Sequence, residues 1–513
     1  MSTQNQVERW GIFELALPGY SDGNPFTDYE IKGTFQNEHE KVDCDGFYDG
    51  EGVYKIRFMP SFVGEYSYRI SGTFSEQTFT GVFTVTEPRK GNHGPVHTVH
   101  TYHFAYADGT PYYSIGTTCY VWHLQTDEQI QNTLETLDKS AFNKIRFCIF
   151  PKHYAYNIGE PRSYPYEGSP MDSGVLTPEN FEQYFFKKEG NHFDFTRFRP
   201  EYFRHIEDCI LELQKSGIEA DLIIMHPYDR WGFSGMTKEQ DDLYVKYITA
   251  RFSAFRNVWW SLANEYDLLP DKQEADWERL AEILMEKDPY GHLRSIHNCK
   301  DFYDHRRPWI THCSIQRIDL YRTAENVNEW REKYGKPVVL DEIAYEGNLK
   351  YGWGNITGEE MLRRFWECAC RGGYPGHSET FLPGEDGMIW WSHGGELHGE
   401  SHERFQLLLD IMKQTPGIGL KPYEKCEWDE VCAVPEETLP DAVPEYCLYY
   451  SSFMQPSSHD FYFDDRTDFS VRVIDTWNMT IEDRGVYRGK FTINLPSRQY
   501  MAIQITKCGM KEE

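Results

Sequence analysis

Two glutamates, each directly after a short apolar run, are the residues best placed to do chemistry. Residues 259–264 precede Glu265, and residues 337–341 precede Glu342. Each run is apolar on both faces, as in a buried parallel strand. In an eight-stranded α/β barrel the carboxyl ends of the strands meet at one mouth, where active sites lie. Two carboxyl groups in such a mouth can attack and protonate a glycosidic bond.

This chemistry makes specific demands on the pair. A retaining glycosidase needs one carboxylate as nucleophile and one carboxylic acid as proton donor, about 5 to 5.5 Å apart. The two groups must also differ in pKa, because one has to be charged while the other carries a proton. We therefore expect Glu265 and Glu342 to share one cavity. The alternative is that both are ordinary surface residues in loops that follow strands.

The elements that must position the pair alternate between strands and helices from about residue 97 to 420. Amphipathic helices are indicated by Pro200 at a helix start and by Thr237 with Gln240 as a capping box. Strands are predicted at 112–118, 144–150, 220–225, 258–263, 294–298, 309–313, 337–341 and 387–391. Eight strands with intervening helices favour a (β/α)8 TIM barrel over an open doubly wound sheet, and no glycine-rich phosphate loop supports the open sheet.

Short alternating strands flank the barrel region at both ends. The pattern predicts a small β-sandwich over residues 1–92, a catalytic barrel over 93–420 and a second small β-sandwich over 421–513. The fold class is therefore α/β, a TIM barrel between two β-sandwich domains. A long segment at 152–199, rich in aromatic residues, either walls one end of a cleft or forms an aromatic mini-core that folds the loop itself.

With Asn264-Glu265 on the fourth predicted strand and Glu342 on the seventh, the sequence resembles the clan A glycoside hydrolases. The resemblance implies that Glu265 is the acid/base and that Glu342 is the nucleophile. It implies that Asn264 contacts the substrate 2-hydroxyl group. The further substrate-binding residues that we expect are Arg146, His226, His297, His312, Trp390, Trp391 and Tyr345. On strand six the clan's His-x-Tyr is replaced by His-Cys-Ser at 312–314, which leaves open what orients the nucleophile.

The stretches 23–28 (GNPFTD) and 46–60 (GFYDGEGVYKIRFMP) are similar to an amino-terminal sandwich of uncharacterised function that precedes glycosidase barrels. The tail resembles another small sandwich of the same proteins. We therefore expect a retaining β-glycosidase that acts on an oligosaccharide or a plant-type glycoside and needs no cofactor or metal, with an exo preference that the long segment at 152–199 favours. A transferase that uses the same two glutamates is not separated from a hydrolase by the sequence.

Composition limits the partners. With 81 acidic and 52 basic residues, the formal charge of -29 opposes binding to nucleic acid or to an anionic membrane. We expect a carbohydrate substrate and self-association into a homo-oligomer. The twelve cysteines have no paired spacing and are expected to be reduced, and the first residues lack a basic segment followed by an apolar one. Both features favour a cytoplasmic location.

Two rival functions remain open. The first is a metal-dependent TIM-barrel hydrolase, because His226, His297, His312 and His393 fall near predicted strand ends. The second is a non-catalytic carbohydrate-binding protein that keeps an aromatic cleft. The presence of both glutamates favours the glycosidase over either rival.

Overall fold

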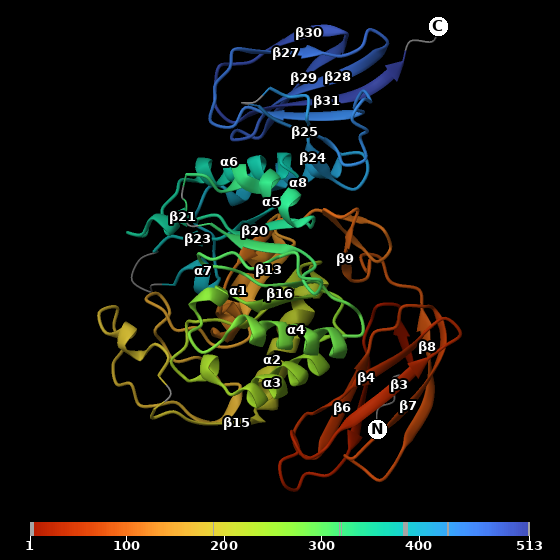
Figure 1. The fold of residues 1–513 in the computed structure, drawn as a ribbon, viewed down its shortest axis with the longest axis vertical. Helices are drawn as coiled ribbons and strands as arrows, with labels where there is room; N and C mark the ends of the chain where they lie inside the picture. Colours follow the sequence, from red (N-terminus) through yellow and green to blue (C-terminus); the bar gives the residue numbers. More distant parts are fainter. Residues whose placement is uncertain are drawn as a thin grey trace.

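The computed structural model describes residues 5–187, 189–317, 319, 321–382, 388–427 and 430–510. Three parts follow one another along the chain (Figure 1). Two amino-terminal sheets lie beside a central barrel, and two carboxy-terminal sheets lie beyond helices on another side of it. The expected fold class, a barrel of parallel strands flanked by sheet-rich parts, is confirmed. The boundaries at residues 92 and 420 stay predictions.

Eight parallel strands form the barrel. In chain order they are β12 (Gly116–Thr118), β13 (Lys144–Cys148), β16 (Glu219–Met225), β17 (Val258–Ala263), β18 (Arg294–Ser295), β19 (Cys313–Gln316), β20 (Val338–Glu342) and β22 (Tyr374–His377). Seven parallel pairings join them in the order β18-β17-β16-β13-β12-β22-β20-β19. A parallel bridge between His297 and Ser314 links the two ends of this sheet. All eight carboxyl ends therefore surround one mouth.

Three predicted strands are corrected. The segment predicted at 112–118 is divided, because β11 (Pro111–Tyr112) belongs to a small sheet with β9 (Val96–Val99) and β10 (His103–Tyr106). The sixth strand begins at Cys313, where the predicted one ends. The eighth strand is β22 and not 387–391, of which residue 387 lies outside the described residues. Its sequence, Tyr-Pro-Gly-His, has no apolar run to predict a strand.

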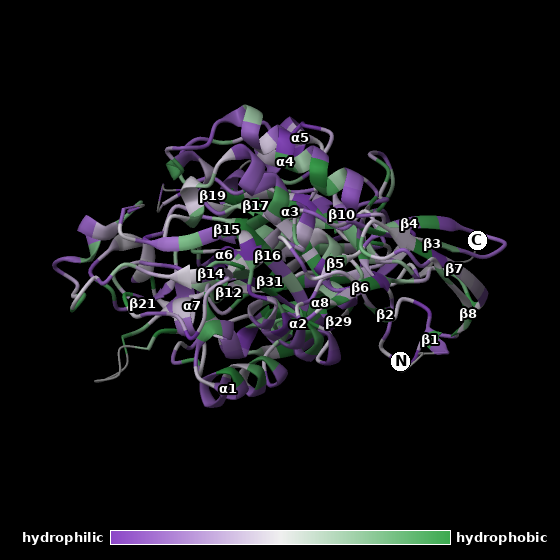
Figure 2. Cartoon of the chain, turned by 90° about the horizontal axis from the view of Figure 1, so that it is seen from below, coloured by the Kyte–Doolittle hydropathy of each residue, from purple (hydrophilic) through white to green (hydrophobic). Residues whose placement is uncertain are grey.

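Helices cover most of the outside of the barrel, and the short helix at 390–393 lies at its mouth. They are α1 (Asp127–Asp138), α2 (Pro200–Lys215), α3 (Lys238–Phe252), α4 (Glu274–Lys287), α5 (Val327–Tyr334), α6 (Gly358–Cys370), α7 (Trp390–His393) and α8 (Phe405–Lys413). Pro200 is the first residue of α2, and the capping box of Thr237 and Gln240 opens α3, as predicted. Hydropathy follows this arrangement, with apolar residues concentrated in central strands such as β16 and β17 (Figure 2).

Charged side chains fill part of the barrel interior. Lys144 on β13 forms ion pairs of 2.9 Å with Asp221 on β16 and 2.7 Å with Asp341 on β20. Because β13 and β20 are not neighbours in the sheet, the second pair crosses the interior. All three residues are buried. This layer of paired charges lies below the mouth and fixes the relative position of three strands.

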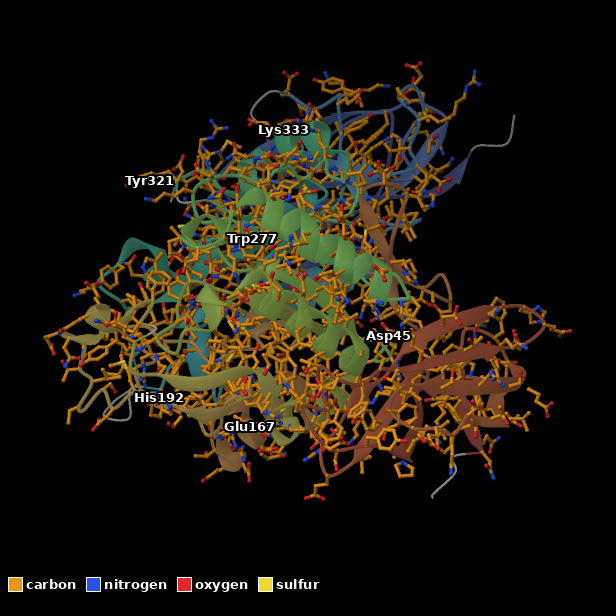
Figure 3. The ribbon with its side chains drawn as sticks, turned by 60° about the horizontal axis from the view of Figure 1, so that its bottom comes forward. Asp45, Glu167, His192, Trp277, Tyr321 and Lys333 are labelled. Atoms are coloured by element: carbon orange, nitrogen blue, oxygen red, sulfur yellow. The ribbon has the colours of Figure 1, made fainter. Side chains whose placement is uncertain are left out.

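The amino-terminal part contains a five-stranded and a three-stranded sheet. The first has β1 (Gln6–Glu8), β8 (Phe79–Thr86), β7 (Gly64–Gly72), β3 (Ile31–Gln36) and β4 (Lys41–Asp45), and the second has β2 (Phe13–Pro18), β6 (Val53–Phe58) and β5 (Phe47–Tyr48). Arg57 of β6 pairs with Glu207 of α2 at 2.7 Å, and Glu207 also pairs with Arg251 of α3 at 2.7 Å. Asp45, labelled in Figure 3, pairs with Lys287 of α4 at 2.9 Å. These ion pairs attach the sheets to the barrel helices.

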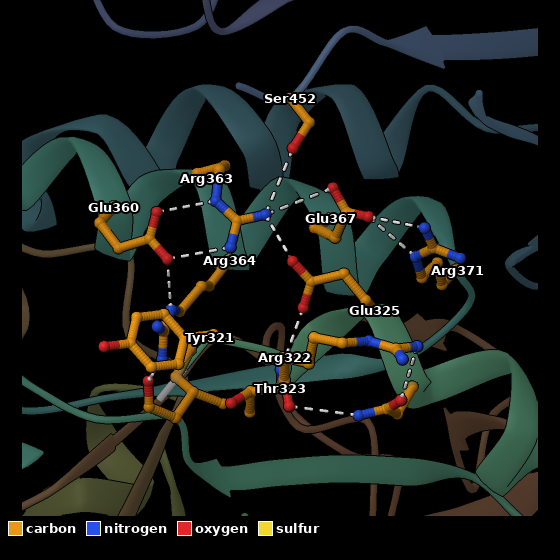
Figure 4. A network of polar contacts seen from close by, with 12 residues as sticks. Tyr321, Arg322, Thr323, Glu325, Glu360, Arg363, Arg364, Glu367, Arg371 and Ser452 are labelled. Atoms are coloured by element: carbon orange, nitrogen blue, oxygen red, sulfur yellow. Dashed lines mark hydrogen bonds and ion pairs between the residues drawn. The ribbon is translucent and has the colours of Figure 1, made fainter. Parts of the chain in front are cut away.

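The carboxy-terminal part has a six-stranded sheet of β24 (Leu420–Pro422), β25 (Val431–Pro435), β26 (Tyr446–Tyr450), β31 (Met501–Met510), β28 (Thr467–Asp475) and β29 (Thr480–Arg488). A two-stranded sheet of β27 (Ser458–Tyr462) and β30 (Lys490–Asn494) packs with it. Arg363 of α6 pairs with Glu360 at 2.7 Å and Glu325 at 2.8 Å, and it donates to Ser452 Oγ at 3.3 Å (Figure 4). The guanidinium thus joins the barrel to the segment after β26.

In the described part of the chain, none of the helices combines the length and the apolar character that crossing a bilayer requires.

Candidate active site

A cavity of about 230 Å³ lies at the carboxyl ends of the barrel strands and contains both glutamates. Its walls are mainly aromatic and polar. The lining residues are Tyr120, Lys152, Tyr154, Tyr228, Glu265, Leu268, Cys299, Gln316, Arg317, Glu342, Ala344, Tyr345, Trp353 and Trp391. The sequence expectation that Glu265 and Glu342 share one cavity therefore matches their positions.

Glu265 follows β17 in a left-handed backbone conformation, with φ 50° and ψ 56°. A non-glycine residue in this region is strained, and such strain is found preferentially at functional sites. Three donors surround the carboxylate. Tyr228 donates to Oε2, Gln316 Nε2 donates to Oε1 at 3.0 Å, and Asn264 Nδ2 donates to Oε2 at 3.2 Å. All three donors are neutral, and within the described part of the chain no ion pair involves Glu265.

Glu342 is the last residue of β20 and has a different set of partners. Tyr120 donates a hydrogen bond of 2.5 Å to Oε1. The buried guanidinium of Arg146 lies 3.6 Å from the same oxygen, and none of the Arg146 nitrogens has a hydrogen-bond partner among the described residues. His297 Nε2 lies 3.9 Å from Oε1, but burial lowers the pKa of His297 well below its usual value, so this ring is neutral. Among the described residues, Arg146 is therefore the charged group within ion-pair distance of Glu342.

A hydrogen-bonded path connects the two glutamates. The Tyr120 hydroxyl that donates to Glu342 also lies 3.4 Å from Asn264 Oδ1. The Nδ2 atom of Asn264 donates to Glu265. Asn264 is 1% exposed, so its amide has little access to water. One tyrosine and one asparagine thus hold the two carboxyl groups in a fixed relation.

Electrostatics make it costly for both carboxyl groups to be charged together. Burial and the neighbouring charge of Glu265 raise the pKa of Glu342 to about 7, against the opposing effects of Arg146, Tyr120 and Lys152. Burial also raises the pKa of Tyr120 and of Tyr228 well above the usual value, so both phenols remain donors.

Lys152 stands in an aromatic cage beside the glutamates. Its ammonium lies 3.3 Å from the ring centroid of Tyr120, 4.0 Å from that of Trp391 and 4.3 Å from that of Tyr228. It has no hydrogen-bond partner among the described residues, and burial lowers its pKa to about 8. The cage contains the two tyrosines that donate to Glu342 and to Glu265. A buried charge therefore acts on both hydrogen bonds at once.

Some of the predicted substrate-binding residues line this cavity and others do not. Tyr345 and Trp391 line it, although Trp391 comes from helix α7 and not from a strand. Trp390 points into the core, where its Nε1 atom donates to Thr117 Oγ1 at 2.9 Å. His226 is buried behind the cavity, 3.3 Å from the carbonyl oxygen of Phe150.

His312 lies at the opposite end of the barrel. Its ring contacts Trp259 and Phe104, with centroids 5.2 Å and 5.8 Å away. The cause is the register of β19, which begins one residue after His312, so that the carboxyl end of the strand is Gln316. Gln316 lines the cavity, where the sequence analysis expected the His-Cys-Ser segment at 312–314. In the chain ranges that the structure describes, no three side chains of His, Cys, Asp or Glu gather as a metal site would need.

Sequence reasoning missed Tyr120, Lys152, Tyr228 and Gln316. Each lies at or shortly beyond the carboxyl end of a barrel strand, at β12, β13, β16 and β19 respectively. This position is a usable signal, since residues that follow barrel strands form the mouth. The sequence selected His226 after β16, but the side chain that reaches Glu265 is two residues further on.

Comparison with known families agrees with this geometry. Residues 99–436 match the apiosidase-like catalytic domain. Residues 6–73 match a domain of unknown function, DUF5060, and residues 428–506 match another, DUF5605. The apiosidase-like match covers more than half of the 513 residues. A comparison with curated proteins gives no match.

Solved structures show the same architecture. A candidate glycoside hydrolase from Bacteroides vulgatus ATCC 8482 is 35% identical, with a TM-score of 0.88 over 98% of this chain and 100% of that chain. A glycoside hydrolase family 5 protein from the same bacterium is 15% identical, with a TM-score of 0.59 over 81% of this chain and 93% of that one, which shows the fold alone. The chain therefore belongs to the family of the apiosidase-like catalytic domain, and it is a glycoside hydrolase.

Proposed function

We propose that this glycoside hydrolase is a retaining, exo-acting β-glycosidase in which Glu342 is the nucleophile and Glu265 the acid/base. The observation that carries the proposal is the asymmetry of the pair. Glu342 has a guanidinium 3.6 Å from its carboxylate, whereas Glu265 is surrounded by neutral donors. A nearby cation favours the charged form of a carboxyl group. The guanidinium of Arg146 therefore supports Glu342, and not Glu265, as the group that attacks in its charged form.

In the first step of the proposed reaction, a Glu342 oxygen attacks the anomeric carbon. The bond to the leaving oxygen breaks, and Glu265 transfers its proton to that oxygen. In the second step, Glu265 takes a proton from water while the water oxygen attacks the anomeric carbon and releases Glu342. The net reaction consumes one water molecule. The contact of Asn264 with a substrate hydroxyl group stays part of the proposal, and its hydrogen bond to Glu265 and its 3.4 Å distance to the Tyr120 hydroxyl support it.

The aromatic walls support a sugar as the occupant. Trp391, Trp353 and Tyr154 line the cavity, and the ring centroids of Trp353 and Trp391 are 5.4 Å apart. Aromatic faces bind the apolar side of a pyranose ring, while the polar groups at the base orient its hydroxyls. A cavity of about 230 Å³ favours removal of one terminal sugar unit.

We extend the proposal to a cytoplasmic location, which the free state of all twelve cysteines supports. Self-association remains a prediction.

The proposal is tested by hydrolysis of a panel of aryl α- and β-glycosides. The wild type and the variants Glu342→Ala, Glu265→Ala and Glu212→Ala are compared, since Glu212 is an exposed residue of α2. We expect one β-glycoside to be cleaved by the wild type and by Glu212→Ala. Glu342→Ala should be inactive and should form a glycosyl azide of inverted configuration when azide is added. Full activity of Glu342→Ala would remove Glu342 from the mechanism.

A further inference from the structure

A second cavity, here called the outer groove, adjoins the catalytic cavity. Its volume is about 850 Å³, within the range of binding sites for small molecules. Residues that line it include Gln125, Tyr156, Asn157, Glu182, Tyr351 and His393. Neither glutamate of the catalytic pair lines it. Among the described residues, Lys152 is the one shared by both walls, so the two cavities lie on either side of its side chain.

Aromatic rings continue from one cavity to the other. Trp353 lines the catalytic cavity and Tyr351 lines the outer groove, and their rings are nearly parallel, at 8°, with centroids 6.1 Å apart. On the inner side Trp353 contacts Trp391, with centroids 5.4 Å apart. The exposed fraction rises outward along this row, from 5% at Trp391 to 40% at Tyr351. Tyr351 at the outer end is therefore the ring of this row that solvent reaches most.

A second aromatic pair makes the same connection from a different loop. Tyr154 lines the catalytic cavity and Tyr156 lines the outer groove, with ring centroids 6.4 Å apart. The two pairs meet on the inner side, where Tyr154 and Trp353 have centroids 6.5 Å apart. Loops after β13 and after β20 therefore each carry one ring in the catalytic cavity and one in the groove.

The charges of the groove favour a neutral occupant. Its carboxylates include Glu160, Glu179 and Glu182, and of these Glu160 is paired with Arg230. Lys350 lies over the Tyr351 ring at 5.0 Å, and the ammonium of Lys152 is buried. Acidic groups therefore outnumber the cations that an anionic ligand could contact. Carboxylates and amides can instead accept and donate hydrogen bonds to sugar hydroxyls.

We propose that the outer groove binds further sugar units of the substrate, so that the enzyme acts on a neutral oligosaccharide that extends from the catalytic cavity over Trp353 to Tyr351. This inference rests on the proposed function, which puts the cleaved sugar beside Glu265 and Glu342. It names the substrate class as an oligosaccharide and gives Tyr351 and Tyr156 the role of binding its outer units.

Calorimetric titration of a Glu265→Gln variant tests the groove without turnover. The probes are mono-, di- and trisaccharides of β-linked glucose, xylose, mannose and galactose. We expect affinity to rise with length in at least one series. Adding Tyr351→Ala should lower trisaccharide affinity by about two- to tenfold and leave monosaccharide affinity unchanged. The matched control is Tyr321→Ala, because Tyr321 is 89% exposed and projects from the surface elsewhere (Figure 3).

The two proposals fail separately. If no series gains affinity with length, or if Tyr351→Ala and Tyr321→Ala behave alike, the groove proposal is wrong. If either of these outcomes is found and the wild type still hydrolyses an aryl glycoside, the proposed function is not affected. Length-dependent binding without hydrolysis of any glycoside by the wild type would leave the groove as a saccharide site and overturn the proposed function.

Discussion

Gln316 stands opposite Glu342 in the ladder between β19 and β20, yet its side chain donates a 3.0 Å hydrogen bond to Glu265. The β19–β20 pairing is irregular between Ser314 and Gln316, and this shift gives Gln316 its place beside the end of β20. Gln316 therefore pairs with Glu342 through its backbone and contacts Glu265 through its side chain. We infer that Gln316 sets the position of Glu265 relative to Glu342.

Replacing Gln316 by Leu should test that role. The variant loses a donor to Glu265, and a hydrogen bond to a charged group contributes about 1.5 to 3 kcal/mol. We therefore expect kcat/KM to fall by about 10- to 100-fold, measured on the best aryl glycoside. The matched control is Gln129→Leu on α1, where the lost hydrogen bond, 3.0 Å to the Gly394 carbonyl, is outside the cavity. Equal activity of the two variants would contradict the role of Gln316.

The pH dependence of the reaction should depend on Tyr120. Its hydroxyl stabilises the charged form of Glu342 and so lowers the pKa of that carboxyl group. Burial and Glu265 act in the opposite direction, and the resulting pKa is about 7. In Tyr120→Phe that pKa rises further, so the acid limb of the kcat/KM profile moves to higher pH. Activity at pH 6 should fall more than activity at pH 8.

The matched control for Tyr120→Phe is Tyr112→Phe. The Tyr112 hydroxyl is also buried, and it donates to the Asn143 carbonyl at 2.9 Å, away from the cavity. Its profile should keep the wild-type acid limb. An unchanged limb in Tyr120→Phe would show that another group controls the ionisation of Glu342.

Most of the barrel could be predicted from the sequence because its strands are buried on both faces. Strands such as β16 and β17 are buried along their whole length of seven and six residues and are mostly apolar, and such runs are visible without any structure. The strand β22 was missed because it is four residues long and contains Pro375 and Gly376. A Cβ atom at Gly376 would lie 2.7 Å from the Leu340 carbonyl oxygen, so close packing there requires glycine. Short strands of this kind depend on their neighbours.

The candidate site was predicted in part. Glu265 and Glu342 could be found because each follows an apolar run. His312 was misplaced because its position depends on where β19 begins, and a boundary error of a few residues moves a side chain from one end of the barrel to the other. Lys152 could not be assigned, since its partners Tyr120 and Trp391 are far away in the sequence. A cage of rings from three segments is visible only in the folded chain.

The raised pKa of Glu342 should also reduce the stability of the folded protein. The pKa of Glu342 is higher in the folded protein than its value of 4.5 in the unfolded chain. Below pH 4.5 the protonated carboxyl group therefore contributes its full stabilisation of the folded state. This contribution is lost as the pH rises through about 7. Glu342→Gln removes the charge and keeps an oxygen that accepts from Tyr120. We expect the variant to be more stable than the wild type at pH 8, by at most about 3 kcal/mol.

Thermal unfolding at several pH values measures this effect. The melting temperature of Glu342→Gln should exceed that of the wild type at pH 8, and the two should converge below about pH 4. Glu282→Gln is the control, because Glu282 is an exposed residue of α4. Equal melting temperatures of Glu342→Gln and the wild type across this range would mean that burial does not raise the pKa of Glu342.

The opposite pH dependence is expected at the contact between the amino-terminal sheets and the barrel. Arg57 and Arg251 lower the pKa of the buried Glu207 from 4.5 to about 2. Glu207 therefore stabilises the fold by about 3 kcal/mol above pH 4.5, and the contribution is lost as the pH falls through about 2. Glu207→Gln leaves two buried guanidinium groups without their shared carboxylate, and such a loss costs about 3 to 5 kcal/mol.

The variant should have a clearly lower melting temperature at pH 7, and the difference from the wild type should shrink as the pH approaches 3. Glu212→Gln on the same helix is the matched control, because the Glu212 side chain is 48% exposed and its pair with Lys215 contributes little. If Glu207→Gln melts like Glu212→Gln at pH 7, the amino-terminal sheets are held to the barrel by apolar packing and not by the charges of Arg57, Glu207 and Arg251.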